Sequence, residues 1–218
     1  MTRNKILGYA IGPIGAAMMG FITLPVITWF YSVEDIGRIS MLQVVISFSI
    51  LIFCLGLDQA YVREYHGHEC QPKLFKAALL PGLTLSIIFF GAIFVFDSRL
   101  ISKWLYDIPS TYLTFISITC FILALISRFL SLILRMEERA LAYSMSQLLP
   151  KVLFLILIVT TVWLGFKKDA YNLITAHTLS ITAVFLVFAW NTRKEWMKAL
   201  EYKIDLKELN HLLSFGLP

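Results

Sequence analysis

The sequence predicts an all-α fold: a polytopic integral membrane helix bundle with six transmembrane helices and the start of a seventh. Hydrophobic residues make up 58% of the 218 residues and charged residues only 15%, against about 25% charged residues in an ordinary soluble domain. The apolar residues are grouped in runs of about 20, the length that crosses a hydrocarbon core of ~30 Å. Soluble helices have shorter amphipathic periods, and membrane-barrel strands need only about 10 residues of alternating polarity.

The expected spans are separated by short connections, which predict an up-and-down bundle with antiparallel neighbours. A cleavable leader is not expected, because the first apolar run exceeds the length of a signal-peptide core and lacks a cleavage site of small residues. The six spans cover residues 8–30, 39–61, 74–96, 111–134, 143–166 and 171–190.

The first span combines small residues with two internal prolines. Gly8, Gly12 and Gly20 recur at intervals that allow another helix to approach closely. Pro13 and Pro25 interrupt the helical hydrogen bonding and predict a bend. We interpret Gly12, Pro13 and Pro25 as a hinge in helix one, with plain helix packing as the alternative.

A polar stripe is expected on the second span. Gln43, Ser47, Cys54 and Asp58 fall within about 60° of one another on a helix, so they should face protein or water and not lipid. Interhelical hydrogen bonding explains the small polar residues. Asp58 has two interpretations: structural pairing, for which Lys151 is a candidate, or coupling to an ion or proton.

The fourth span carries a cation within an apolar run. Arg128 shares one helix face with Ser131 and Arg135. Because a cation in hydrocarbon costs a few kcal/mol or more, such a residue usually faces a bundle interior or a wet cavity. Snorkelling of Arg128 to the interface is the alternative.

The fifth span also carries a cation within an apolar run. Gln147 and Lys151 lie on one face. Pro150 precedes the lysine and should free the backbone carbonyl of Ser146. His177 in the sixth span is expected to be a packing residue, with a proton relay as the lesser alternative.

The distribution of basic residues predicts that the N-terminus lies in the cytoplasm, because the loops on that side carry most of them. The net charge of +5 is explained by this topology and not by nucleic-acid binding. The cytoplasmic segments would hold Arg3, Lys5, Arg63, Lys73, Lys76, Arg135, Arg139, Arg193, Lys194, Lys198, Lys203 and Lys207, and the outer loops Arg38, Arg99, Lys103, Lys167 and Lys168.

Three segments are expected along the chain. Residues 1–191 form the six-helix lobe, and residues 192–210 form a cytoplasmic amphipathic linker. Residues 211–218 begin a seventh helix that is cut off, and their Gly216-Leu217-Pro218 is similar to Ile11-Gly12-Pro13 in the first span. A repeated helix opening is typical of transporters built from two parallel halves.

No enzyme constellation is found in the sequence. Phosphate-binding glycine loops and nucleophile elbows are missing from it. Cys54, Cys70 and Cys120 have neither metal-ligand spacing nor an even count for disulfides. We therefore expect no catalytic residues, no metal and no cofactor.

Three stretches lie at the ends of these spans or between them: TWFYSVEDIG at 28–37, GLDQAYVREY at 56–65 and RMEERA at 135–140. Together they resemble the bacterial polysaccharide (O-antigen type) flippases of the multidrug/oligosaccharidyl-lipid/polysaccharide exporter superfamily. The resemblance implies one lobe of a MATE-like two-lobe transporter in the bacterial inner (plasma) membrane. Such flippases move undecaprenyl-diphosphate-linked oligosaccharides across the membrane by alternating access.

This resemblance implies a lipid-linked oligosaccharide as the main partner, besides membrane lipids, a C-terminal lobe and other polysaccharide-assembly proteins. Arg128, Lys151 and Arg63 are the expected contacts for the lipid diphosphate. Gln43, Gln147 and Ser131 are expected to line the cavity with polar groups. A cation-coupled multidrug exporter, a membrane-embedded polymerase or ligase, and a non-transporting remnant or partner subunit are the alternatives.

Overall fold

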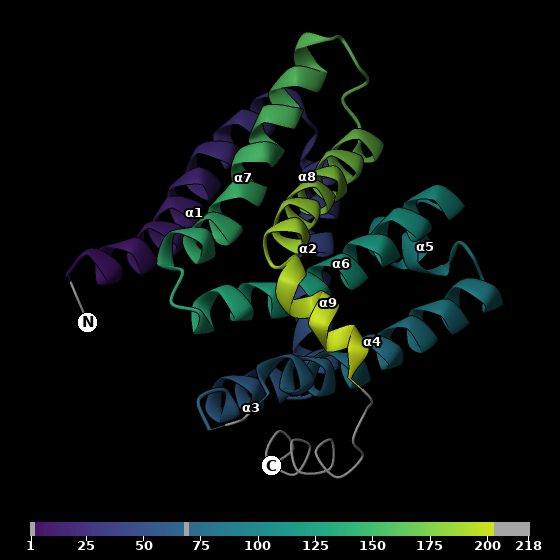
Figure 1. Ribbon diagram of the computed structural model, residues 1–218. Helices are drawn as coiled ribbons and strands as arrows, with labels where there is room; N and C mark the ends of the chain where they lie inside the picture. Colours follow the sequence, from purple (N-terminus) through teal and green to yellow (C-terminus); the bar gives the residue numbers. More distant parts are fainter. Residues whose placement is uncertain (1–2, 68–69, 203–218) are drawn as a thin grey trace.

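The computed structural model describes residues 3–67 and 70–202, with the side chains of residues 3–6 excepted. Within these residues the chain forms nine helices and no strand (Figure 1). The helices are α1 (Arg3–Phe30), α2 (Val33–Cys54), α3 (Leu57–Glu64), α4 (Gln71–Phe96), α5 (Leu100–Tyr106), α6 (Thr111–Met136), α7 (Ala140–Trp163), α8 (Ala170–Asn191) and α9 (Arg193–Glu201).

Six of these helices are long and apolar enough to cross a membrane, which confirms the predicted fold class. They are α1, α2, α4, α6, α7 and α8. Five of the predicted ranges overlap the observed helices closely. The second span is the exception, because α2 begins earlier than the expected residue 39 and ends at Cys54 instead of residue 61.

Two consecutive left-handed residues end α2. Leu55 has φ 49° and Gly56 has φ 69°, and the Leu55 N–H bonds the Ile52 carbonyl oxygen at 3.3 Å. Glycine adopts this conformation without steric cost, whereas a leucine there is strained. Asp58 therefore lies on the separate helix α3, and it does not continue the stripe of Gln43 and Ser47.

Helix α6 is the centre of the bundle. It packs against α2, α4, α7 and α8 and also contacts the short helices α3 and α5. Half of its most apolar stretch is buried, the largest share among the spans. Its fully buried side chains fill the core: Phe121, Leu125, Phe129, Leu132 and Ile133.

Helices α1 and α7 form a pair at the side of this bundle (Figure 1). A Cβ atom on Gly12 would lie 2.7 Å from the Cα of Ser144, so glycine is required for the two backbones to approach. The Ser144 hydroxyl donates to the Gly8 carbonyl oxygen. Helix α1 runs unbroken through Pro13 and Pro25. Packing thus accounts for Gly12, and the hinge remains a prediction.

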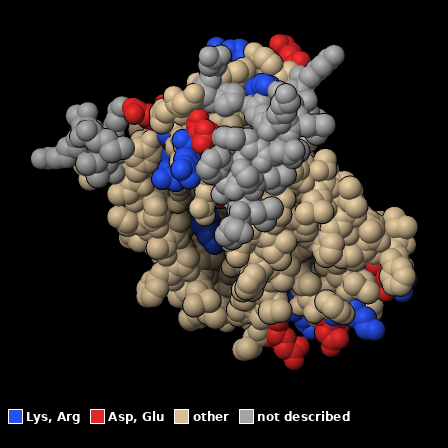
Figure 2. Space-filling model, turned by 90° about the horizontal axis from the view of Figure 1, so that it is seen from below, with Lys and Arg blue, Asp and Glu red and all other residues tan. Residues whose placement is uncertain are grey.

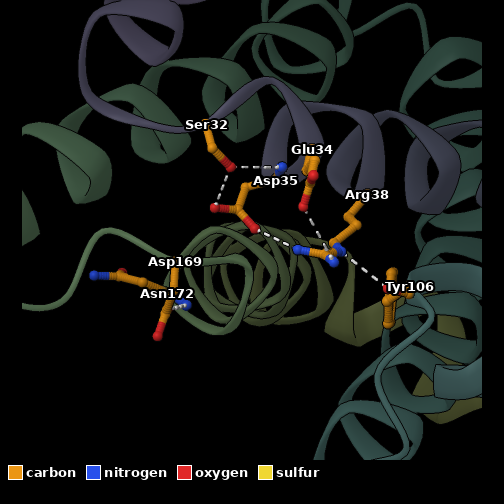
Figure 3. A network of polar contacts seen from close by, with 7 residues as sticks. All are labelled: Ser32, Glu34, Asp35, Arg38, Tyr106, Asp169 and Asn172. Carbon is orange, nitrogen blue, oxygen red and sulfur yellow. Dashed lines mark hydrogen bonds and ion pairs between the residues drawn. The ribbon is translucent and has the colours of Figure 1, made fainter.

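A polar network fastens the opposite end of the spans, where α1 ends and α2 begins (Figure 3). The Ser32 hydroxyl accepts from the Asp35 N–H at 3.2 Å and caps α2. Arg38 pairs with Asp35 at 2.8 Å and donates to the Tyr106 carbonyl oxygen at 2.9 Å. The Asp169 carboxylate caps α8 through the Asn172 N–H. The bond from Arg38 to Tyr106 fixes α2 against α5.

The expected amphipathic linker is helical in its described part. In α9, Ala199 is buried and Trp196 is partly buried, while Lys194 and Lys198 are exposed. Residues 203–210 of that segment and the expected start of a seventh helix at 211–218 lie outside the described residues. The domain boundaries remain predictions.

We predict that Gly82→Ala lowers the free energy of unfolding by about 1–3 kcal/mol, the usual cost of overpacking a tight contact. A Cβ at Gly82 would lie 2.0 Å from the Phe53 carbonyl oxygen, at the end of α2. Gly91 on the same helix has nothing within 4 Å of such a Cβ. Unfolding in mixed detergent should leave Gly91→Ala unchanged or more stable. Equal effects of the two variants would refute the close approach.

Candidate anion-binding cavity

A cavity of about 370 Å³ lies among α2, α6, α7 and α8. Its walls come from the middle of each helix, and they combine polar side chains with an apolar remainder. Figure 2 shows one face of the molecule hollowed near its centre, with Lys or Arg atoms inside the hollow and at its rim. The lining residues are Gln43, Ile46, Ser47, Ala124, Ser127, Ser146, Gln147, Pro150, Lys151, Phe154, His177, Ser180, Ile181 and Val184.

Lys151 is the one Lys or Arg among the described residues that line this cavity. It is partly buried on α7. Within the part of the chain that the structure describes, no carboxylate forms a salt bridge with it, and none of the lining residues is acidic. An uncompensated cation among membrane spans is costly unless water or an anion meets it. The cavity is therefore electropositive.

Two polar groups on the cavity walls lack an expected partner among the described residues. Pro150 has no N–H, so the carbonyl of Ser146 on the cavity wall is without its helical donor. The Ser127 hydroxyl is buried and has no hydrogen-bond partner among the described residues. In a membrane, unsatisfied groups of this kind occur where a protein lines a wet or ligand-binding space. Gln43 and Gln147 add amide donors to the same walls.

His177 lines this cavity, although a packing role was expected for it from the sequence. Its side chain is buried, and its Nδ1 lies 4.0 Å from the Cys120 Sγ. The Phe154 ring stands edge-on to the imidazole with 5.2 Å between ring centroids. A usable signal was present, because His177, Ser180, Ile181 and Val184 follow i, i+3, i+4, i+7 spacing, typical of one helix face.

Arg128 lies outside the residues that line the cavity and has a partner. Its Nη2 donates to the Asp58 Oδ2 at 2.9 Å, with side-chain exposures of 43% for Arg128 and 14% for Asp58. The suggested pairing of Asp58 with Lys151 is thus not formed. Ser131 also lies apart from the cavity, and its hydroxyl donates to the Arg128 carbonyl oxygen at 2.6 Å.

Arg63 is exposed on α3, five residues beyond Asp58 and on a different face of that short helix. Of the residues predicted to bind substrate or line the cavity, Gln43, Gln147 and Lys151 come together in one cavity. Arg128 and Asp58 form a separate pair. The described residues contain no group of three His, Cys, Asp or Glu side chains placed to hold a metal ion.

The fold and the cavity are those of a multi-pass helical membrane protein with a cation in a polar space between its spans. Residues 3–218 match the family described as polysaccharide biosynthesis protein, and the chain belongs to that family. Comparisons with curated proteins and with solved structures found no match. The protein thus has a role in polysaccharide biosynthesis or transport at a membrane.

We predict that Arg128 and Asp58 are energetically coupled. In a double-mutant cycle of Arg128→Gln and Asp58→Asn, the coupling energy should be about 1 kcal/mol, the upper end for partly exposed pairs. Unfolding of the two single variants and the double variant in mixed detergent measures it. Additive effects would show that the 2.9 Å contact contributes nothing to stability.

Proposed function

We propose that this protein moves an undecaprenyl-diphosphate-linked oligosaccharide across the bacterial inner membrane by alternating access, with its N-terminus in the cytoplasm. The observation that carries the proposal is Lys151, a cation without an acidic partner among the described residues, in a polar cavity between the spans. Membership of the polysaccharide biosynthesis family supports a saccharide as cargo. Such a cargo presents a diphosphate between an apolar tail and a polar glycan.

The cavity chemistry suits the diphosphate. A Lys ammonium acts as a point charge toward phosphate, and charge-assisted hydrogen bonds are about twice as strong as neutral ones. The Ser127 hydroxyl and the amides of Gln43 and Gln147 are further donors on the walls. Binding an anion would lower the cost of keeping Lys151 among the spans.

We assign to Arg128 a second, weaker contact with the diphosphate. Its guanidinium uses one nitrogen for Asp58 and keeps 43% of its side chain exposed, so other donors remain accessible. The phosphate would share or displace the Asp58 carboxylate there. Arg63, exposed on α3, is proposed to meet the anion on its approach.

The pairing of α1 with α7 suggests how the cavity opens. Lys151 and Gln147 lie on α7, which packs closely against α1, whereas the remaining walls belong to α2, α6 and α8. A movement of the α1–α7 pair relative to those helices would change access to Lys151. A hinge at Gly12, Pro13 and Pro25 in α1 would permit this movement.

A cation-coupled multidrug exporter of the same fold is the second candidate. Such a transporter would use carboxylates in its cavity to hold cations. None of the residues lining the cavity here is acidic, and the carboxylate of Asp58 is engaged by Arg128 outside the lining. The charge of the site therefore favours an anionic cargo.

We predict that Lys151→Gln lowers export of surface polysaccharide by about 10–100-fold, the loss expected when one charged hydrogen bond is removed. Arg128→Gln should cause a smaller loss, since Arg128 is already paired. Lys151→Arg keeps the charge and should retain most export. The measurement is surface glycan per cell in a bacterial strain that lacks its own copy of the protein.

The matched control is Lys103→Gln, which removes an exposed base of α5 far from the cavity lining. Immunoblots of washed membranes establish that every variant is inserted in equal amount. Normal export by Lys151→Gln at wild-type protein level would overturn the anion-binding role of the cavity.

A further inference from the structure

A second cavity, of about 260 Å³, lies between α4, α6, α8 and α9, away from Lys151. Apart from Lys76, the residues that line it are aliphatic or aromatic. The lining includes Phe75, Leu79, Leu83, Leu130, Phe185 and Trp196. We refer to this space as the α9 slot.

Specific hydrogen bonds hold α9 over the slot. The Trp196 indole N–H donates to the Ala189 carbonyl oxygen of α8 at 2.7 Å. The Lys76 ammonium of α4 donates to the carbonyl oxygens of Leu200 and Tyr202 at 3.2 and 2.7 Å. Helix α9 is thus fastened to both neighbouring spans, and the slot is a fixed feature of the fold.

The slot lies toward one end of the bundle. Its residues come from the first half of α4 and from the second halves of α6 and α8, toward the end of the spans where α9 follows. In a bilayer the slot would lie within one leaflet. Water does not fill an apolar space of this kind. A lipid acyl chain is apolar, surrounds the bundle in a bilayer and can enter such a space.

The charges on α9 favour an anionic head group. Arg193, Lys194 and Lys198 are exposed, and the Arg193 guanidinium lies 4.4 Å from the Trp190 ring. Of the two acids on α9, Glu195 lies toward α3, where it lines a small cavity with Tyr61 and Tyr65. Burial, followed by Glu137 and Glu195, raises the pKa of Tyr65, which agrees with this placement. The other acid, Glu201, is exposed at the C-terminal end of α9.

We propose that the α9 slot binds one acyl chain of an anionic phospholipid whose head group lies on the basic residues of α9. Trp190 and Trp196 are at the level where tryptophans anchor membrane proteins to the interface. Basic residues next to a span attract anionic lipids. This inference is independent of the cargo and of the role of Lys151.

Quenching of Trp196 by lipids with brominated acyl chains tests the proposal, because the indole lines the slot. In a variant with the other four tryptophans replaced by phenylalanine, bilayers containing brominated phosphatidylglycerol or brominated phosphatidylcholine are compared at equal mole fraction. A matched variant that retains Trp163 alone, at the other end of the spans, reports bulk lipid contact.

The proposal predicts that phosphatidylglycerol quenches Trp196 at a several-fold lower mole fraction than phosphatidylcholine, while Trp163 shows no preference. Replacing Arg193, Lys194 and Lys198 by glutamine should weaken the preference by up to about fivefold for each residue. Leu79→Phe, which fills the slot, should remove it. Leu85→Phe, on an exposed position of the same helix outside the lining, should leave it intact.

Two results would overturn the proposal. Equal quenching of Trp196 by both lipids, unchanged in Leu79→Phe, would mean ordinary bulk lipid contact. Weak quenching of Trp196 by either lipid, with normal quenching of Trp163, would mean that protein covers the slot, either residues 203–218 or a second copy of the chain.

Discussion

A charged group among membrane spans costs a few kcal/mol or more, and this constraint explains much of the structure. Two cations lie within the apolar helices, and they have different surroundings. Arg128 receives the Asp58 carboxylate at 2.9 Å. Lys151 receives no carboxylate among the described residues, and a polar cavity surrounds it instead. We predict that the first arrangement stabilises the bundle, and we propose that the second binds an anion.

The ion pair depends on the break that ends α2. If α2 continued beyond Cys54, Asp58 would stay on the face of Gln43 instead of reaching α6 from the separate helix α3. The left-handed residues Leu55 and Gly56 make the break, and the contact of Gly82 with the Phe53 carbonyl brings α4 against it. A local backbone feature thus decides which cation is neutralised.

The sequence predicted the fold better than the site. Span number and position follow from the length and composition of apolar runs, which the bilayer dictates, so five ranges agree closely with the helices. The break at Leu55-Gly56 was missed because both residues lie in an apolar run that satisfies a continuous span equally well. Gly56 and the polar residues that follow it were the available signal.

Helix-face arguments predicted the cavity in part. Gln43, Gln147 and Lys151 each lie on a polar face of their own helix, and those faces meet in the structure. Which faces meet depends on tertiary packing, so the choice of Arg128 over Lys151 as the partner of Asp58 could not be read from spacing. His177 was overlooked because a single histidine in an apolar helix is usually a packing residue.

Lys151 has no acidic partner among the described residues, and we propose that this leaves it free to bind an anionic head group. Equilibrium binding of farnesyl diphosphate and of farnesol to the purified protein in a neutral detergent tests it most directly, because the two ligands differ only in the diphosphate. The account predicts about tenfold or more tighter binding of the diphosphate, a preference that Lys151→Gln removes and Lys103→Gln retains. Equal affinities for the two ligands, or an unchanged preference in Lys151→Gln, would contradict it.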